Sequence, residues 1–132
     1  MQKKYLMKRL TTIITCISVV FFIASCEKFD SQIKGKVTYP SENNEERVAS
    51  AALVYKYKVL KNNKEEKISS VLADSNGLYV FDYVTAGEWK IVAELTIGDT
   101  IYNGKSGVIS TSGDDTKEVN IRLDTYDVSN NE

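Results

Sequence analysis

Apolar and polar side chains alternate along residues 32–123, and this period of two limits the fold more than any other feature of the sequence. Successive side chains of a β-strand point to opposite faces of a sheet, so the alternation predicts strands with one buried face. No window longer than ten residues has a helical spacing that competes with it. The sequence therefore predicts an all-β domain. In the first and last predicted strands, the apolar parity consists of Ile33, Gly35, Val37 and Tyr39, and of Val119, Ile121 and Leu123.

Turn-forming residues divide the sequence between these two strands. Pro40 is expected to end the first strand, and residues 41–47 are polar enough to form an exposed loop. In the next expected strand, residues 49–60, one parity holds Leu53, Tyr55, Tyr57 and Val59, and the other holds Lys56 and Lys58. Later strands are expected at residues 68–73, 79–81, 89–97, 101–102, 108–109 and 118–123, with turns at 61–67, 74–77, 98–99 and 112–115 and a break at Gly104. Residues 124–132 are expected to be a disordered polar tail.

The alternation also predicts which side chains meet in the core. Tyr79 and Phe81 share one parity, and the following strand has a longer apolar face that begins at Trp89. We expect these two faces to oppose each other across the core, with Trp89 buried. The longer face consists of Trp89, Ile91, Ala93, Leu95 and Ile97.

The first 25 residues have the composition of a secretion signal. Lys3, Lys4, Lys8 and Arg9 precede the apolar residues 11–24, and the segment contains no carboxylate. This stretch of 14 residues is shorter than the roughly 20 apolar residues that a membrane-spanning helix needs. Small residues then lead to a cysteine in the run Ile23-Ala24-Ser25-Cys26. The pattern predicts cleavage before Cys26.

This run resembles the lipobox of bacterial lipoproteins. The resemblance implies that residues 1–25 are removed as a lipoprotein signal peptide and that Cys26 becomes the lipidated N-terminus, with a thioether diacylglycerol and an amide-linked acyl chain such as palmitate. Two or three acyl chains hold a protein on a membrane essentially permanently. The implied location is the cell outer membrane. An uncleaved signal anchor, or an ordinary secretory signal with Cys26 as a bystander, is the alternative.

Residues 26–31 are expected to be a flexible tether between lipid and domain. Glu27 and Asp30 resemble the acidic residues that follow the lipidated cysteine in surface-exposed lipoproteins of Bacteroidota. A solvated linker whose charges keep it off the bilayer is the other interpretation. The sequence does not decide whether the domain faces the periplasm or the cell surface.

Composition excludes several classes of function. Residues 26–132 carry 13 basic and 18 acidic side chains, and without a basic block they offer no electrostatic footprint for nucleic acid. The chain has no histidine, and its two cysteines are Cys16, in the signal segment, and Cys26. Catalytic triads, histidine metal sites and disulfides are therefore excluded from the mature chain.

Acidic side chains do not suggest an active site or a metal site either. The neighbouring pairs Asp114-Asp115, Glu65-Glu66 and Glu45-Glu46 all lie in predicted turns or loops, where charges are usually solvated. The run Asp74-Ser75-Asn76-Gly77 begins like a calcium loop but lacks the later ligands, so turn chemistry explains it better. We expect a protein without catalytic activity, cofactor or metal.

A second resemblance covers the centre of the chain. The runs Asp74-Ser75-Asn76-Gly77-Leu78-Tyr79-Val80-Phe81 and Val84-Thr85-Ala86-Gly87-Glu88-Trp89-Lys90-Ile91 resemble the signature of carboxypeptidase regulatory-like domains, and Gly35-Lys36-Val37 resembles their opening strand. Val84 and Thr85 replace the leucine and proline common in that family. The resemblance implies a seven-stranded, transthyretin-like (prealbumin-like) Greek-key β-sandwich over residues 32–123. It implies no peptidase, because the zinc-binding catalytic domain is a separate unit.

Related sandwiches join a lysine to an asparagine in a covalent crosslink promoted by a buried carboxylate. Lys36, Asn120 and Glu94 are the nearest candidates, but each has the parity opposite to the apolar face of its strand. We expect all three to point outward, where the lysine amine is not desolvated, so the crosslink is not expected.

Aromatic side chains leave a binding function open. Five of the eight tyrosines, Tyr39, Tyr55, Tyr57, Tyr83 and Tyr102, lie in or beside predicted strands, where they either stack on sugar rings or pack half-buried. Asp99-Thr100-Ile101 also resembles the acceptor motif of Bacteroidota O-glycosylation, with Thr100 as acceptor.

The favoured hypothesis is an envelope lipoprotein, held to the membrane through Cys26, whose β-sandwich is a non-catalytic accessory, adhesion or protein-interaction module. The alternative is a carbohydrate-binding lipoprotein of a polysaccharide-uptake system. An exposed coplanar pair of tyrosines would favour the alternative.

Overall fold

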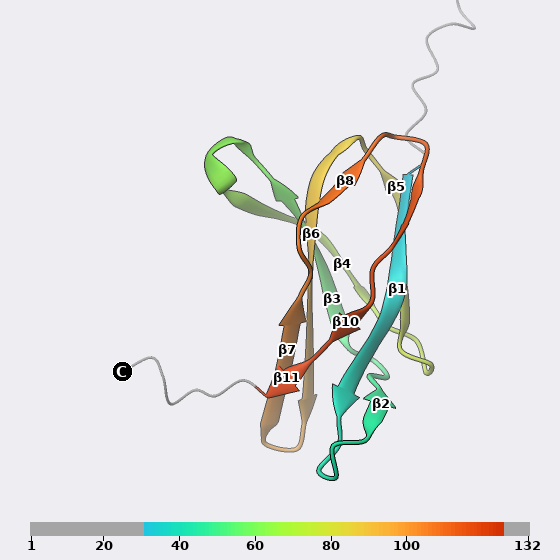
Figure 1. The fold of residues 1–132 in the computed structure, drawn as a ribbon, viewed down its shortest axis with the longest axis vertical. Helices are drawn as coiled ribbons and strands as arrows, with labels where there is room; N and C mark the ends of the chain where they lie inside the picture. The colour runs from blue at the N-terminus through green and yellow to red at the C-terminus, as the bar shows by residue number, and fades with distance from the viewer. Residues whose placement is uncertain (1–30, 126–132) are drawn as a thin grey trace, which may run out of the picture.

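Residues 31–125, which the computed structural model describes, form two β-sheets that pack face to face (Figure 1). The first sheet contains β1 (Ser31–Pro40), β2 (Glu46–Val48), β5 (Leu78–Val84), β9 (Thr116–Glu118) and β10 (Ile121–Arg122). The second contains β3 (Leu53–Val59), β4 (Glu65–Leu72), β6 (Gly87–Ile97), β7 (Thr100–Lys105), β8 (Ile109–Thr111) and β11 (Asp124–Thr125). A short 3₁₀ turn, η1 (Lys61–Asn63), joins β3 to β4. The prediction of an all-β sandwich is confirmed, and the transthyretin-like order of strands stays a prediction.

The described residues contain eleven strand segments, where the alternation predicted eight and the family resemblance implied seven. Part of the difference is β2, which begins inside the predicted loop 41–47, ends at Val48 and pairs with the end of β1. Another part is β11, which forms inside the predicted polar tail and pairs with β7. Polar residues take up strand conformation at both places because a neighbouring strand presents free backbone groups.

Strand β1 lies at the centre of the first sheet and uses both of its edges. Antiparallel β5 and β2 lie along one edge, and parallel β9 and β10 lie along the other. The backbone of Val37 bonds on the first side, to Gly77 and Ala49, whereas the carbonyls of Lys34 and Thr38 accept bonds from the closing segment. Alternate backbone groups of β1 thus point to opposite edges, as a central strand requires.

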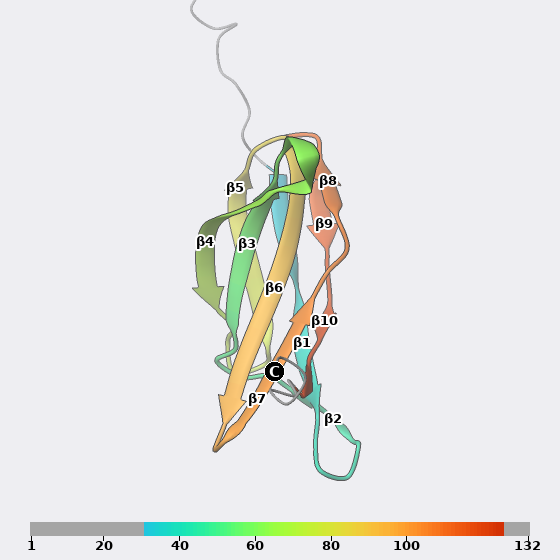
Figure 2. The same ribbon diagram turned by 90° about the vertical axis from the view of Figure 1, so that its left-hand side faces the viewer.

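The second sheet runs in the order β4, β3, β6, β7 and β11, and Figure 2 shows β4, β3, β6 and β7 side by side. On the edge of β6 that pairs with β7, strand β8 pairs with the first three residues of β6, which precede the part bonded to β7. Between β7 and β8, Ser106 replaces a regular ladder pair: its Oγ accepts a hydrogen bond from the Ile91 N–H, and its own N–H donates to the Ile91 carbonyl. The edge of β6 therefore stays bonded along its whole length on this side.

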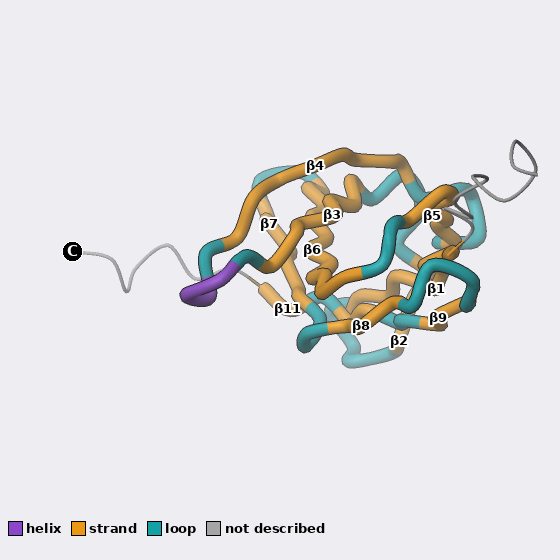
Figure 3. The backbone as a smooth tube through the Cα atoms, turned by 90° about the horizontal axis from the view of Figure 1, so that it is seen from above, coloured by secondary structure: helices purple, strands orange, loops and turns teal. Residues whose placement is uncertain are grey.

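The core lies between the two layers, which Figure 3 shows from above. Tyr79 and Phe81 from β5 and Trp89 from β6 are buried as predicted, as are Ile91 and Ala93. The expected face of β6 is buried only in part, because Ile97 is 43% exposed. The buried apolar residues are Ile33, Val37, Ala49, Ala52, Val54, Ala73, Tyr79, Phe81, Val84, Trp89, Ile91, Ala93, Ile121 and Leu123.

Strand β3 places a lysine in the core. Its buried parity is that of Val54 and Lys56, whereas Tyr55 and Tyr57 lie half-buried on the outer face of the sheet. Lys56 is 7% exposed, and its Nζ lies 4.8 Å from the Trp89 ring centroid and 5.4 Å from that of Phe81. Desolvation lowers the pKa of Lys56. The aromatic faces thus accommodate an amine that the interior disfavours as a cation.

The predicted closing strand, residues 118–123, is divided into β9 and β10. The reason is Tyr79, whose buried hydroxyl donates a hydrogen bond to the Val119 carbonyl oxygen. That carbonyl lies over Gly35, where a Cβ atom would overlap it. The Asn120 side chain then replaces the missing ladder bond, because its Oδ1 accepts from the Lys36 N–H at 3.0 Å. A buried hydroxyl and a glycine therefore override the alternation at this point.

The sequence predicted a break at Gly104, and this prediction is wrong. Gly104 lies within β7. The closing segment crosses from the first sheet to the second beside it, and a Cβ at Gly104 would lie 2.6 Å from the Arg122 carbonyl oxygen. The glycine permits a close approach of two backbones. The turn predicted at 61–67 is shorter than expected, because β4 already begins at Glu65, and Asn62 and Asn63 have positive φ in it. The turn predicted at 74–77 forms, and Asp74 Oδ1 accepts from the Asn76 and Leu78 N–H groups.

Candidate functional site

The sandwich has two distinct ends, because β1 runs along its length. Its ten residues span about 33 Å. Ser31 pairs with Val84 at one end, here called the N-terminal end, and Pro40 pairs with Glu46 at the other, here called the distal end. In Figure 1 these are the top and the bottom of the molecule.

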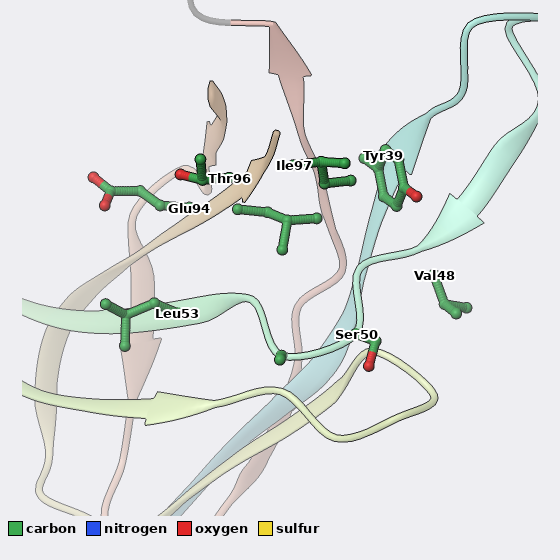
Figure 4. Close-up of a pocket in the computed structure, with 9 residues that line it drawn as sticks. Tyr39, Val48, Ser50, Leu53, Glu94, Thr96 and Ile97 are labelled. Carbon is green, nitrogen blue, oxygen red and sulfur yellow. The ribbon is translucent and has the colours of Figure 1, made fainter. Parts of the chain in front are cut away.

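A cavity of about 500 Å³ opens at the distal end, between the end of β6 and the turn before β3. Figure 4 shows Tyr39 from β1 and Ile97 from β6 in its lining. Apolar side chains dominate, and Val48 and Ile97 are 39% and 43% exposed. The lining consists of Tyr39, Val48, Ser50, Ala51, Leu53, Glu94, Leu95, Thr96 and Ile97.

The cavity exists because β6 extends beyond its neighbour β3. The pairing of β3 with β6 stops at Leu53 and Glu94, whereas the pairing of β7 with β6 continues to Ile97. The chain before Leu53 turns away, with Ala51 at a φ of 60° and the Ala52 N–H bonded to the Ala49 carbonyl. The last residues of β6 are therefore paired on one side only.

A second hollow, of about 230 Å³, continues from the first and shares Tyr39 and Ile97 with it. The rings of Tyr39 and Tyr102 lie there with centroids 5.3 Å apart and planes tilted by 58°. Polar groups of the 41–47 loop complete the lining, namely Ser41, Glu42, Asn43 and Arg47. We call the two hollows together the distal groove. It combines an apolar floor with a polar rim, which is the composition of a ligand-binding surface.

The remaining predicted tyrosines lie elsewhere. Tyr55 and Tyr57 form a second tilted pair on the outer face of the second sheet, with centroids 6.4 Å apart and a 58° angle between the planes. The Nζ of Lys67 lies 4.0 Å from the Tyr55 ring centroid. Tyr83 is 79% exposed at the N-terminal end. Neither tyrosine pair is coplanar, so the feature that would favour a flat sugar platform is not found in residues 31–125.

A hydrogen-bonded cluster fixes the start of the domain at the N-terminal end. The buried Ser31 Oγ donates to Asp115 Oδ1 at 2.6 Å and accepts from the Gly113 N–H at 2.9 Å. The bond from Ser31 and a second one from the Ser112 N–H hold the pKa of Asp115 at about 2. Asp115 is therefore ionised at neutral pH and holds the start of β1 against the turn at 112–115.

The three residues weighed for a covalent crosslink are not brought together. Lys36 and Asn120 are both exposed, and Asn120 accepts a bond from the Lys36 backbone rather than from its amine. Glu94 is exposed on β6 in the other sheet. The prediction that all three point outward is confirmed.

Other predicted sites are placed as follows. In residues 31–125 no three acidic, histidine or cysteine side chains come close enough to hold a metal ion. The pair Glu65-Glu66 lies in β4 rather than in the predicted turn, and Lys90 Nζ contacts Glu65 Oε1 at 2.6 Å. Thr100 is exposed as the first residue of β7. Cys26 lies outside the described residues, and no helix in the described part is long and apolar enough to cross a membrane.

Sequence reasoning placed Tyr39 and Tyr102 among candidate binding residues but missed the rest of the distal groove. Val48 lay just beyond a predicted loop, and Ile97 was assigned to the core by parity. Both residues would have been assigned to the groove if the start of β3 at Leu53 had been known, but alternation alone placed that start at residue 49. Only the register between β3 and β6 shows that Thr96 and Ile97 lie beyond it.

Comparisons with known proteins bear on the fold. No family model and no curated protein matches the sequence. Among solved structures, a candidate carbohydrate-binding protein from Pseudomonas aeruginosa superposes with a TM-score of 0.54 at 12% identity, over 76% of this chain and 93% of that one. An (S)-allantoin synthase superposes with a TM-score of 0.41 at 10% identity, over 81% of this chain and 47% of that one. At the identity of the first match, the likeness supports the β-sandwich fold and nothing more specific.

Proposed function

We propose that this chain is a membrane-anchored, non-catalytic envelope module that uses its distal groove to bind an envelope partner. The observation that carries the proposal is the direction of β1. The strand leads from the end nearest Cys26 to Tyr39 in the groove. A groove at that end is presented away from the attachment point.

The short tether keeps the N-terminal end of the domain close to the lipid attachment point. Four residues, 27–30, separate Cys26 from Ser31, and the five steps of a fully extended chain between them span at most about 18 Å. The cluster of Ser31 with Asp115 begins the rigid domain at that point. With Cys26 lipidated, the N-terminal end faces the bilayer, and the groove lies about 33 Å farther out.

The composition supports binding rather than catalysis. The chain has no histidine, and its only cysteine after the signal segment is the lipidation candidate Cys26. Asp115, the acid with a lowered pKa, is held by Ser31 far from the groove. The groove offers apolar contacts, hydroxyls, one arginine and two glutamates, and the glutamates line different hollows, Glu94 the first and Glu42 the second.

Carbohydrate binding is the second candidate function. One solved structure of similar fold is described as a candidate carbohydrate-binding protein, and the Tyr39–Tyr102 pair offers aromatic surface beside polar groups. The tilt of 58° between the rings restricts stacking to one ring at a time. A polysaccharide-uptake system would present such a module at the cell surface.

Two experiments test the proposal. A photo-crosslinking amino acid at Ser50, on the exposed rim of the groove, should capture a partner in intact cells, whereas the same group at Ser110, an exposed position on β8, should not. Equal capture at both positions, or none at either, contradicts the assignment of the groove. Separately, Cys26→Ser should release the protein from carbonate-washed membranes. Retention of that variant would disprove the lipid anchor.

A further inference from the structure

The end of β6 carries backbone groups that no strand of the described domain uses. Alternate residues of a strand in an antiparallel sheet bond to opposite neighbours. Ile91 bonds to Ser106 on the β7 side, so the backbones of Val92, Glu94 and Thr96 point to the β3 side. Strand β3 begins at Leu53, opposite Glu94, and its pairing with β6 extends no farther toward Thr96. The Thr96 N–H and C=O therefore point to a side where residues 31–125 supply no strand.

The chain that precedes β3 does not fill this position. Ala52 is committed to two other bonds, because its N–H donates to the Ala49 carbonyl and its carbonyl accepts from the Ala73 N–H. Ala51 turns away with a positive φ. Thr96 itself is exposed, so its backbone edge is accessible from solvent.

Apolar surface lies directly beside this free edge. The 500 Å³ cavity that Thr96 lines also includes Tyr39, Val48 and Ile97, and both aliphatic side chains are partly exposed. In Figure 4 Thr96 and Ile97 lie next to each other at one wall. A free strand edge next to an apolar hollow is the arrangement that binds extended peptides, because backbone bonds give affinity and the hollow accepts a side chain.

The charge around the groove defines the partner further. Glu94 lines the first hollow, Glu42 the second, and Asp99 lies in the turn that follows β6. Arg47 is the one basic side chain in the lining of the two hollows. The groove is therefore acidic on balance and favours a cationic segment.

We propose that the distal groove binds an extended, cationic peptide segment of a partner protein, which adds as a short strand to β6 at Thr96 and inserts an apolar side chain between Tyr39 and Ile97. The inference rests on the proposed function and names its partner class. A sugar would contact the aromatic pair and would not bond to the strand edge. Only the peptide is therefore expected to form a hydrogen bond with the Thr96 backbone.

The test uses the whole mature chain, residues 26–132, with Cys26→Ser in place of the lipid. The probe is a blocked pentapeptide of alternating lysine and valine, and its matched control carries N-methyl groups on the valine nitrogens. Nuclear magnetic resonance reports which amides shift and how fast the Thr96 N–H exchanges with solvent. Saturable shifts at Val48 and Ile97, with slower exchange at Thr96, are expected for the probe and not for its control.

Two variants separate the backbone of Thr96 from its side chain. Thr96→Pro removes the N–H and should weaken peptide binding about 5–10-fold, the equivalent of one hydrogen bond. Thr96→Val keeps the N–H, removes the hydroxyl and should bind within about twofold of the wild type. If Thr96→Pro does not fold, the exchange rate of the Thr96 N–H in the wild type decides the question.

Three results would overturn the inference: no groove shift at millimolar peptide, equal binding of the N-methylated control, or greater loss in Thr96→Val than in Thr96→Pro. Shifts at Tyr39 and Tyr102 caused by maltohexaose, without protection of Thr96, would assign the groove to a glycan instead. Failure of the peptide leaves the crosslink from Ser50 as an independent result, so the two proposals fail separately.

Discussion

The two ends of the sandwich are built in opposite ways. At the N-terminal end the polar groups are paired internally: Ser31 bonds to Asp115 and Gly113, and the Trp89 Nε1–H donates to the Thr85 carbonyl and to Thr111 Oγ1. At the distal end β6 extends beyond β3, and apolar side chains of the groove are partly exposed. One end is closed by its own hydrogen bonds, and the other is left open.

Under the proposed function, this difference separates two tasks, attachment and binding. At the closed end, hydrogen bonds hold Ser31, the first residue of β1, against Asp115 and Gly113. Strand β1 then runs from this end to the distal end. The open end keeps an unpaired edge and apolar surface, which reduce stability and favour binding. Changes at the closed end and in the centre should therefore lower the free energy of unfolding, whereas changes at the distal end should alter binding.

Gly35→Ala should have the largest effect on stability. The new Cβ overlaps the Val119 carbonyl and displaces it from the Tyr79 hydroxyl, so we expect a loss of about 3–5 kcal/mol in the free energy of unfolding. Urea denaturation measures it. Gly107→Ala, where a Cβ meets nothing within 4 Å, is the matched control and should change stability by less than about 0.5 kcal/mol. Similar losses in both variants would mean that the close approach at Gly35 is unimportant.

Ser31→Ala should cost less and should change the response to acid. It leaves the buried Gly113 N–H without an acceptor, a loss of about 1–3 kcal/mol at pH 7. In the wild type, Asp115 has a pKa of about 2, below its unfolded value, so its contribution is present above pH 4 and is lost as the pH falls toward 2. The variant should lose less stability over that interval, as urea titrations from pH 5 to 2 would show. An unchanged acid dependence would contradict the role of Ser31.

The same deletion of one methyl group at each end tests the comparison directly. Ile91→Val in the fully buried centre should cost about 0.5–1.5 kcal/mol. Ile97→Val at the distal groove should cost less than about 0.5 kcal/mol, because its side chain is already partly solvated. Thermal unfolding of both variants measures the contrast. Equal costs would show that the distal end is packed as tightly as the centre.

Lys56→Met should raise stability at neutral pH by up to about 1 kcal/mol, because an apolar side chain replaces a buried amine. Burial lowers the pKa of Lys56, so the unfolded chain binds more protons and wild-type stability rises as the pH approaches 10.5 from below. The variant should lack this rise as the pH increases toward 10.5. Above pH 10 the raised pKa of Tyr79 acts in the opposite sense, because only the unfolded state ionises. The exposed Lys34→Met is the control, and an unchanged rise in Lys56→Met would contradict the burial argument.

Much of the fold could be predicted from local patterns. The buried parities of β1, β5 and most of β6 follow from alternation, since a side chain of the wrong polarity at Ile33 or Ile91 would have to enter the core. The turns at Asn62 and Asp74 follow from their backbone preferences. In the candidate site, however, only Tyr39 and Tyr102 were singled out, because the groove depends on where one strand ends relative to another.

The sequence by itself determined the class of fold, the absence of histidine chemistry and the predicted lipid attachment at Cys26, since each depends on residue type and spacing along the chain. The tertiary structure alone decided that Lys56 enters the core, that Val119 turns toward Tyr79, and that β6 extends past Leu53. Those features depend on register and on contacts between distant segments. At these positions the most stable conformation depends on the shape and the hydrogen bonds of a neighbouring segment, which the local sequence pattern does not contain.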